Sequence, residues 1–370
     1  MLAPERHREI MRLLRLRGAV RLADVMVRIG CSESTARRDL AVLESLGELR
    51  RVHGGATTVE DRQSRGPVLD ELRTVALGLR TNRGHRFGST GTVGLLIPQR
   101  GYYWAAVLDG AQRAAELTGL RLVLGEAPDP QTDEAVRLRS LLHLEVDALL
   151  VAPNLHRLGD TRVLEALQGV DVPVVLLERR VPEAFATRDV DSVTSDHSHG
   201  GRLAGRHLLD RGHRRIAFLG WPVSPTYEPV LTGLRTAIDD AGATVVEHPL
   251  RWLGRIDHQD HRGQVVEALA ALRAQRVTAV LCQPDEAALY LLDAARARGV
   301  RIPQDLAVIS YDDELSGAAT PPLTAVAPAK QDIGFSAIML CLRRIARLGP
   351  PPHATQQVML LPDLVIRESG

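Results

Sequence analysis

The chain has 370 residues, with 46 basic and 45 acidic side chains and a formal net charge of +1. This length is enough for two or three domains, and the balanced charge excludes a polycation, so any nucleic-acid site must be local. The hydrophobic share of 45% and the charged share of 25% are typical of a soluble globular protein.

Cysteine usage and the N-terminal sequence bear on the compartment. Cys31, Cys282 and Cys341 lie far apart and form neither a disulfide framework nor a metal-binding spacing, which favours a reducing compartment. The stretch MLAPERHREI lacks the apolar core of a signal peptide, and no run of about eighteen apolar residues is present to span a membrane. We therefore expect a cytoplasmic protein.

Residues 1–60 predict three helices and a hairpin. Apolar positions at helical spacing indicate helices over residues 5–17 and 21–29, and a third helix from the N-cap Ser32 to about Leu46. The basic segment LRRVHGGA, residues 49–56, predicts a hairpin that turns at or near its glycines. Three helices followed by a basic hairpin are typical of a winged helix-turn-helix.

The third helix has two different faces. An apolar stripe opposes a face of small hydroxyl residues and adjacent arginines: Ala36, Leu40 and Leu43 against Ser34, Thr35, Arg37 and Arg38. A helix that lies against a phosphate backbone would have this composition. A solvated surface helix in an arginine-rich chain would also carry it, so the helix by itself leaves both interpretations open.

Three groups of residues carry a more specific signature: Arg6, Ile10 and Leu14; then Ser32-x-x-Thr35-Ala36-Arg37-Arg38-Asp39-Leu40; then Arg51-Val52-His53-Gly54-Gly55-Ala56. Together they resemble the DNA-binding domain of the deoxyribose-operon-repressor (DeoR) type over nearly all of residues 1–57. The resemblance implies that the third helix enters the major groove and that the hairpin forms the wing. The side chains then expected at DNA are Ser34, Thr35, Arg37, Arg38, Arg51 and His53. A carboxylate facing phosphates would repel them, so we expect Asp39 to pair with an arginine of its own domain.

Residues 58–91 are polar and rich in glycine, with one short amphipathic helix expected over 68–79. This segment predicts a linker. It is either a plain spacer or an element that couples ligand binding to a change of conformation.

From Thr92 onward, short apolar runs alternate with amphipathic helical stretches, which predicts parallel sheets with helices on both faces. The expected strands are residues 92–98, 120–125, 146–153, 172–177, 215–220, 278–282 and 306–311. Four glycines are expected as left-handed helix caps: Gly119, Gly212, Gly242 and Gly299. Roughly 280 residues are too many for one such sheet, so we expect two lobes.

Ligands in open α/β sheets bind beyond the carboxyl ends of strands, and these ends carry aromatic and charged side chains here. The residues concerned are Tyr102, Tyr103, Trp104, Glu178, Arg179, Trp221 and Asp285. Rings stack on the apolar face of a sugar, and charged groups hydrogen-bond its hydroxyls, so this set suits a hydroxylated ligand.

Long ordered motifs carry a second resemblance over about residues 92–370: VGLLIP, DGAQRAAELTGLRLVLGE, VTSDHSHGGRLAGRHLLDRGHRRIAFLG, VRIPQDLAVISYDD, TPPLTAVAP and LPDLVIRESG. They resemble the sensor of the lactose/purine-repressor family. The resemblance implies the type I periplasmic-binding-protein fold: two Rossmann-like α/β lobes joined by crossing strands, with an effector between them. Joined to the DeoR-type domain, it predicts domains at 1–57, 58–91 and 92–370.

Carried over residue by residue, the resemblance places Tyr103 and Trp104 where the family stacks aromatics on the effector, and Asp285 on its ligand-binding aspartate. The other expected effector contacts are Tyr102, Glu178, Arg179, Asp196, Trp221 and His258. The chain departs from the family at Pro284, where asparagine is common, at Glu228 and Val230, where an arginine is usual, and at His258, where an aromatic is expected. Asp312 and Asp313 are expected to cap a loop or to pair across the lobes rather than to contact ligand.

Enzyme and metal chemistry are disfavoured. His197, His199, His207 and His213 cluster in sequence but lack a metal-binding spacing, and no phosphate loop, dinucleotide fingerprint or nucleophile elbow occurs. We expect no catalytic residue, metal or cofactor.

The combined interpretation is an effector-responsive regulator, most simply a repressor. It would act as a homodimer on a nearly palindromic operator and respond to a sugar or sugar derivative. The alternatives are a sugar kinase or isomerase that carries a DNA-binding module, and a transport binding protein, which the N-terminal module disfavours.

Overall fold

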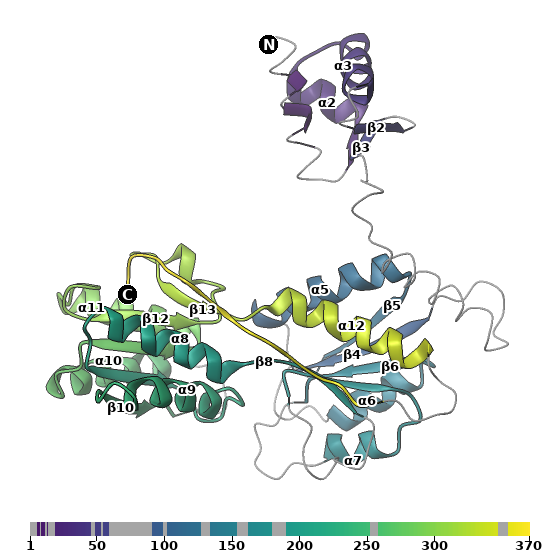
Figure 1. Ribbon diagram of the computed structural model, residues 1–370. Helices are drawn as coiled ribbons and strands as arrows, with labels where there is room; N and C mark the ends of the chain where they lie inside the picture. Colours follow the sequence, from purple (N-terminus) through teal and green to yellow (C-terminus); the bar gives the residue numbers. More distant parts are fainter. Residues whose placement is uncertain are drawn as a thin grey trace. The chain divides into compact units, whose positions relative to one another are not determined.

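A computed structural model describes residues 6–7, 9–11, 13, 19–45, 49–52, 55–58, 91–98, 102–126, 134–153, 162–179, 190–251, 258–346 and 354–370. The chain divides into two compact units, Met1–Glu71 and Leu72–Gly370 (Figure 1). Apart from its end residues Thr58 and Gly91, the predicted linker lies outside the described residues, and so does its expected helix. The domain boundaries therefore stay predictions.

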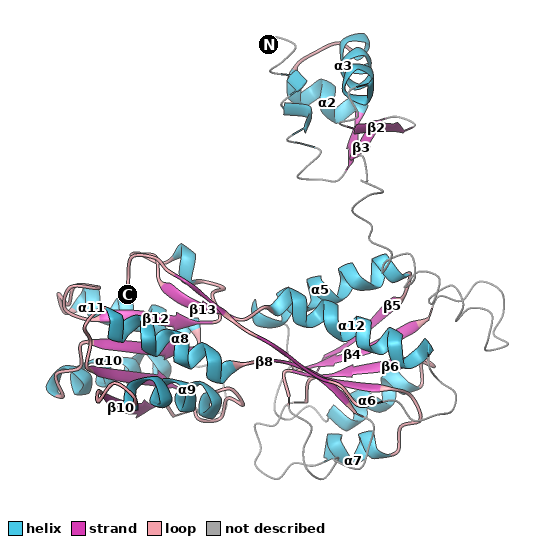
Figure 2. Cartoon of the chain, viewed as in Figure 1, coloured by secondary structure: helices cyan, strands magenta, loops and turns pink. Residues whose placement is uncertain are grey.

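The N-terminal unit is a helical module with a small sheet (Figure 2). Its elements are β1 (Ala19–Arg21), α2 (Leu22–Ile29), α3 (Glu33–Ser45), β2 (Leu49–Val52) and β3 (Gly55–Thr58). The described residues of the first predicted helix, 6–7, 9–11 and 13, are helical as well. The second and third helices and the hairpin are confirmed, the helices to within a residue.

Strand β1 was not expected from the sequence. It pairs antiparallel with β3, so the sheet order is β1-β3-β2. A three-residue segment carries no period-2 pattern and is a strand only because β3 offers it hydrogen-bonding partners. The apolar stripe of α3 is buried as predicted, with Ala36 at 0%, Leu40 at 2% and Leu43 at 4% exposure, and it packs in one cluster with Ile10 and Val25.

The C-terminal unit contains two six-stranded sheets. The first has the order β14-β8-β7-β6-β4-β5 and is parallel throughout. Its elements are β4 (Thr92–Ile97), α5 (Tyr102–Thr118), β5 (Arg121–Glu126), α6 (Glu134–Leu142), β6 (Ala148–Val151), α7 (Arg162–Gln168), β7 (Val174–Leu177), β8 (Asp191–Ser195), α12 (Lys330–Ala346) and β14 (Gln357–Leu360).

The second sheet has the order β10-β9-β11-β12-β13-β15 and is parallel except for its edge pair β13 and β15. Its elements are α8 (His197–Asp210), β9 (Arg215–Gly220), α9 (Tyr227–Asp239), β10 (Thr244–Pro249), α10 (His258–Ala274), β11 (Ala279–Gln283), α11 (Asp285–Ala297), β12 (Ala307–Tyr311), the short 3₁₀ helix η2 (Ser316–Ala318), β13 (Thr324–Ala327) and β15 (Asp363–Val365).

Helices cover both faces of each sheet, which explains why the central strands are continuous apolar runs. In the first lobe α5 and α12 pack on one face and α6 and α7 on the other. In the second lobe α10 and α11 oppose α8 and α9. Successive residues of β9 alternate between the two cores, with Ala217 and Leu219 on one side and Ile216 and Phe218 on the other.

The chain passes between the lobes at three places: from β8 to α8, from β13 to α12, and from β14 to β15. This connectivity and the two parallel sheets confirm the predicted two-lobed fold. All seven predicted strands are present, and the four glycine caps have φ values of 74°, 88°, 64° and 67°.

Glycines set the closest helix contacts in each lobe. A Cβ atom at Gly334 of α12 would lie 1.9 Å from the Val107 carbonyl oxygen of α5, and one at Gly110 would lie 1.9 Å from the Gln331 carbonyl oxygen. Gly233 of α9 meets the backbone of α8 in the same way. These backbones therefore touch directly, and the start of α12 is held against α5.

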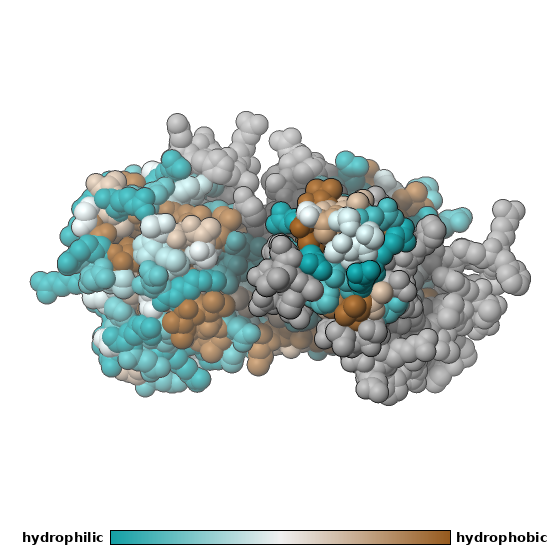
Figure 3. Space-filling view, turned by 90° about the horizontal axis from the view of Figure 1, so that it is seen from above, coloured by the Kyte–Doolittle hydropathy of each residue, from teal (hydrophilic) through white to brown (hydrophobic). Residues whose placement is uncertain are grey.

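The exposed surface is mixed in character. On the face seen in Figure 3, hydrophobic residues form separate patches between hydrophilic ones. In the described part of the chain, no helix combines the length and hydrophobicity needed to cross a bilayer.

Candidate functional site

A hydroxyl cluster caps the first turn of α3. Ser32 Oγ accepts a hydrogen bond from the Thr35 backbone N–H at 3.3 Å, which confirms the predicted cap. Its oxygen also lies 3.0 Å from Ser34 Oγ and 2.9 Å from Thr35 Oγ1. The exposed start of this helix therefore presents several hydroxyl groups to solvent.

Asp39 is the polar anchor of α3. Arg6 donates to both of its carboxylate oxygens, at 2.6 Å and 3.0 Å, and His7 Nε2 lies 3.2 Å away. These hydrogen bonds, the one from Arg6 first, hold the pKa of Asp39 below its ordinary value. The expectation that Asp39 pairs with an arginine of its own domain is confirmed, and the pair sets which side of α3 faces outward.

The two arginines of α3 differ in their surroundings. Arg37 donates to Glu33 Oε1 at 2.9 Å and 2.6 Å, with both side chains more than half exposed. Arg38 is exposed and has no side-chain partner among the residues that the structure describes. The strand β2 contains Arg51, whose side chain lies outside the described part of the chain, as does His53 entirely.

In the C-terminal unit, Glu178 forms the centre of a buried polar network. It follows β7 and accepts hydrogen bonds from the Ser195 N–H at 3.0 Å, from the Ser195 hydroxyl at 2.9 Å and from the Tyr103 hydroxyl. His197 Nε2 lies 3.3 Å from Glu178 Oε2, the oxygen that also accepts from the Ser195 N–H. Burial alone would raise the pKa of Glu178, but His197, Ser195 and Tyr103 outweigh it and bring the pKa to about 2.

The network continues into the second lobe. His197 begins α8, and its Nδ1 lies 2.9 Å from the hydroxyl of Tyr311 at the end of β12. Burial and the Glu178 carboxylate raise the pKa of Tyr103 well above its ordinary value, so that hydroxyl remains a donor. Tyr103 and Glu178 of one lobe are thus connected through His197 to Tyr311 of the other.

A second link runs from the start of α12. Lys330 is 8% exposed, and its ammonium contacts the Glu314 carboxylate and the Asp312 carbonyl oxygen. The same ammonium lies 5.6 Å from the centre of the Tyr103 ring, a cation–π distance. Lys330 therefore connects the first turn of α12, the loop after β12 and α5.

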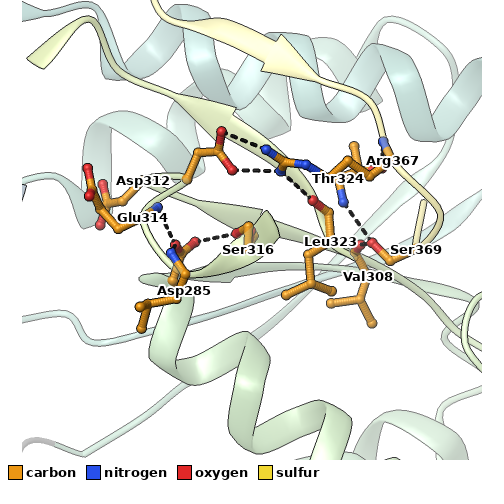
Figure 4. Close-up of polar contacts among 12 residues, drawn as sticks. Asp285, Val308, Asp312, Glu314, Ser316, Leu323, Thr324, Arg367 and Ser369 are labelled. Carbon is orange, nitrogen blue, oxygen red and sulfur yellow. Dashed lines mark hydrogen bonds and ion pairs between the residues drawn. The ribbon is translucent and has the colours of Figure 1, made fainter. Parts of the chain in front are cut away.

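Asp285 is fully engaged by that same loop (Figure 4). It is 2% exposed and accepts from the Glu314 N–H at 2.7 Å, the Leu315 N–H at 2.8 Å and the Ser316 hydroxyl at 2.8 Å. The residue expected to bind effector thus holds the loop after β12 in place.

The adjacent aspartates behave differently from each other. Asp313 pairs with Arg367 at 2.6 Å and 3.0 Å, within its own lobe rather than across the lobes. The Asp312 carboxyl has no hydrogen bond within the described part of the chain and is half-buried. Burial, followed by the nearby Asp285 charge, raises the pKa of Asp312 well above its ordinary value. The expected pairing across the lobes is therefore wrong for Asp313, whose partner lies in the same lobe, and the Asp312 carboxyl forms no pair within the described residues.

The remaining predicted effector residues fall into three groups: partly exposed, buried, and outside the described residues. Trp104 is half-buried and meets the Tyr103 ring edge-on at 5.5 Å, and Asp196 caps α8 through the His199 N–H at 2.8 Å. Arg179 is turned inward, where it donates to the Pro153 carbonyl at 2.8 Å. Trp221 is buried beside His261, at 5.2 Å between ring centres. The side chains of Tyr102 and His258 lie outside the described residues.

Gln283 was missed by the sequence analysis, although it stands at a strand end. It is 3% exposed, and its Nε2 donates to the Thr226 hydroxyl. Its Oε1 is buried without a hydrogen-bond partner in the part of the chain that the structure describes. An unsatisfied buried acceptor costs about 1–3 kcal/mol, so this oxygen retains the capacity to accept a hydrogen bond. His197 and Tyr311 were also missed as site residues, since their role depends on a contact between distant segments.

Two family models match the chain. A DeoR-like helix-turn-helix domain covers residues 6–62, and a periplasmic binding protein-like domain covers residues 206–370. The ribose operon repressor of Haemophilus influenzae is 28% identical over 292 residues, which is 78% of this chain and 83% of that protein. The repressor PurR of Escherichia fergusonii is 28% identical over 290 residues, 78% of this chain and 82% of that protein. The solved complex of the transcriptional regulator CelR with cellobiose is 26% identical, with a TM-score of 0.63 and 92% of each chain covered.

Proposed function

This chain joins a DeoR-type winged helix-turn-helix to a sensor of the lactose/purine-repressor family, and we propose that it is a repressor that a sugar releases from its operator or recruits to it. The chain is a DNA-binding regulator controlled by a small metabolite. That this metabolite is a sugar is our proposal. It is supported by the ribose and cellobiose in the names of two similar proteins and by the side chains at the strand ends described above.

One observation carries the sugar assignment: two polar groups at the carboxyl ends of strands in the second sheet still have hydrogen-bonding capacity. The Asp312 carboxyl and the Gln283 Oε1 atom accept no hydrogen bond within the described residues. Gln283 is the last residue of β11, and Asp312 directly follows β12. Trp104 offers a half-buried ring from the first lobe. A sugar supplies hydroxyl donors and an apolar ring face, which matches this set.

We assign different roles to the predicted effector residues. Trp104, Asp196, Asp312 and Gln283 would contact the sugar. The half-buried Tyr103 and the buried Glu178, Arg179, Trp221 and Asp285 would shape the site through the hydrogen bonds and packing described above, and Tyr102 and His258 remain expected contacts.

At the N-terminal unit the proposed DNA contacts are Ser34, Thr35, Arg37, Arg38, Arg51 and His53. We further propose a homodimer on a nearly palindromic operator, a cytoplasmic location and no turnover of the sugar. The absence of sugar turnover is supported by the relatives, which are named as repressors.

The proposal is tested by thermal unfolding of the full chain against sugars, sugar phosphates and nucleosides. A ligand at about a hundred times its dissociation constant adds about 2.7 kcal/mol of stability, which shifts the midpoint by several degrees. The shift should disappear in Trp104→Ala and in Asp312→Asn, and should persist in Asp305→Asn, an exposed aspartate of the same lobe. A neutral sugar that fails while a nucleoside succeeds would overturn the sugar class. If no ligand shifts the unfolding midpoint, the proposal that this unit is a sensor is contradicted.

A further inference from the structure

The orientation of α3 separates its two arginines. The buried side of the helix carries Ala36, Leu40 and Leu43, together with Asp39, which is 4% exposed and bonded to Arg6. With about 3.6 residues per turn, the direction opposite this buried side passes closest to Ser34 and Arg38 within residues 33–38, the N-terminal part of α3. Arg37 and Glu33 lie together at one edge of the exposed face.

We propose, resting on the proposed function, that Ser34 and Arg38 read base edges while the Glu33–Arg37 pair at the edge sets the strength of backbone binding. The first turns of a recognition helix lie deepest in the major groove, and residues at the centre of its outer face reach the bases. Arg38 occupies that position and has no side-chain partner among the described residues. An arginine free to extend there forms two hydrogen bonds with guanine O6 and N7.

Arg37 is placed for a different contact. Its guanidinium is already held by Glu33 at 2.6 Å, and both side chains are exposed, at 65% and 56%. Arg37 at the rim of the helix faces the phosphates that border the groove. Glu33 brings a negative charge to the same rim and competes with phosphate for Arg37. The pair therefore lowers affinity for all DNA equally, and Glu33 acts as a brake on non-specific binding.

The experiment is selection of binding sites from a random duplex library by the full chain, which reveals the operator motif directly. Four variants are compared with the unchanged protein: Arg38→Ala, Arg37→Ala, Glu33→Gln and the control Arg301→Ala. Arg301 is an exposed arginine of the second lobe, paired with an aspartate four residues later. Each selection is repeated with the pooled sugar panel present. Affinity is then measured for the selected site and for random DNA over a range of salt concentrations.

We expect Arg38→Ala to erase one G·C pair from the selected motif and to weaken the selected site by about 5- to 150-fold, with a smaller effect on random DNA. Arg37→Ala should weaken both DNAs by the same factor, lower the salt slope by about one unit and leave the motif unchanged. Glu33→Gln should strengthen both DNAs by the same factor and also keep the motif. Arg301→Ala should match the unchanged protein.

Two results would overturn this division of roles. One is a motif that survives Arg38→Ala with a uniformly weaker affinity, which would make Arg38 a phosphate contact. The other is a motif altered by Arg37→Ala or Glu33→Gln, which would place that pair at the bases. A failure of the proposed function would look different. In that case neither the unchanged protein nor Arg301→Ala would enrich any sequence.

Discussion

At the scale of single residues, carboxylates organise both units. Asp39 joins α3 to the first helix through Arg6, and Glu178 joins the two lobes through His197. Each is buried, so each depends on its hydrogen-bond donors to remain ionised. The stability of both units should therefore depend on pH and on these individual charges.

For Glu178 the pKa of about 2 in the folded chain lies below its ordinary value of 4.5. The stabilisation is therefore complete above about pH 4.5 and is lost as the pH falls toward 2. Glu178→Gln should reduce the stability of the sensor by roughly 3 kcal/mol at pH 7, with a difference that shrinks in acid. All three tryptophans lie within residues 92–370, so urea unfolding followed by tryptophan fluorescence reports on this unit. The exposed Glu116→Gln on α5 is the control, and a pH-independent difference would contradict the prediction.

For Asp39, the hydrogen bonds from Arg6 lower the pKa, so its stabilisation is present at neutral pH and declines below its unfolded pKa. Asp39→Asn should destabilise the N-terminal unit by about 2 kcal/mol. Hydrogen exchange of the α3 amides measures this locally. Asp24→Asn, an exposed acid in the first turn of α2, should leave those amides unchanged. Equal exchange in the two variants would mean that the Arg6 contact contributes no stability.

At the scale of elements, helix pairs are fixed by direct backbone contact. There is no room for a Cβ atom where α12 crosses α5, because a Cβ at Gly334 would lie 1.9 Å from the Val107 carbonyl oxygen. A backbone atom cannot rotate away as a flexible side chain can. The crossing therefore fixes the start of α12, from which Lys330 extends to the loop after β12.

Gly334→Ala should therefore cost about 3 kcal/mol or more in the free energy of unfolding, at the upper end of overpacking effects. Gly263 is the matched control, since it lies inside α10 and a Cβ there meets nothing within 4 Å. Gly263→Ala should stabilise the sensor by roughly 0.5–1 kcal/mol through helix propensity. Urea midpoints from tryptophan fluorescence compare the two. Similar shifts of the same sign would show that the crossing tolerates separation.

At the scale of the whole molecule, the proposed function requires that sugar and operator change each other's affinity. Such couplings typically amount to about 1–3 kcal/mol, or roughly 5- to 150-fold. We expect the sugar found by thermal unfolding to change operator affinity by that order. The operator should change sugar affinity by the same factor, because linkage is reciprocal. Titrations of each ligand in the presence and absence of the other measure both factors, and unequal factors at equilibrium would show that the two ligands act on different species.

Features that depend on neighbours along the chain could be predicted from the amino-acid order alone. Apolar runs bounded by turn residues located the seven predicted strands, glycines located the helix caps, and a serine before an acidic first turn located the start of α3. The motif residues also placed Asp39 beside an arginine, because a carboxylate on a DNA-facing helix needs a partner. These inferences succeed because period, capping and backbone conformation are local properties.

Contacts between side chains from distant segments became visible only in the folded chain. His197 and Tyr311 are 114 positions apart in sequence and share a hydrogen bond, and the Asp285 carboxylate is taken up by a loop about 30 positions away. Strand β1 exists only through its pairing with β3. Asp312 was expected to cap a loop or to form a pair, yet its carboxyl has no hydrogen bond within the described part of the chain. Such pairings depend on how separate elements pack, and no local pattern encodes the distance between residues that the fold alone brings together.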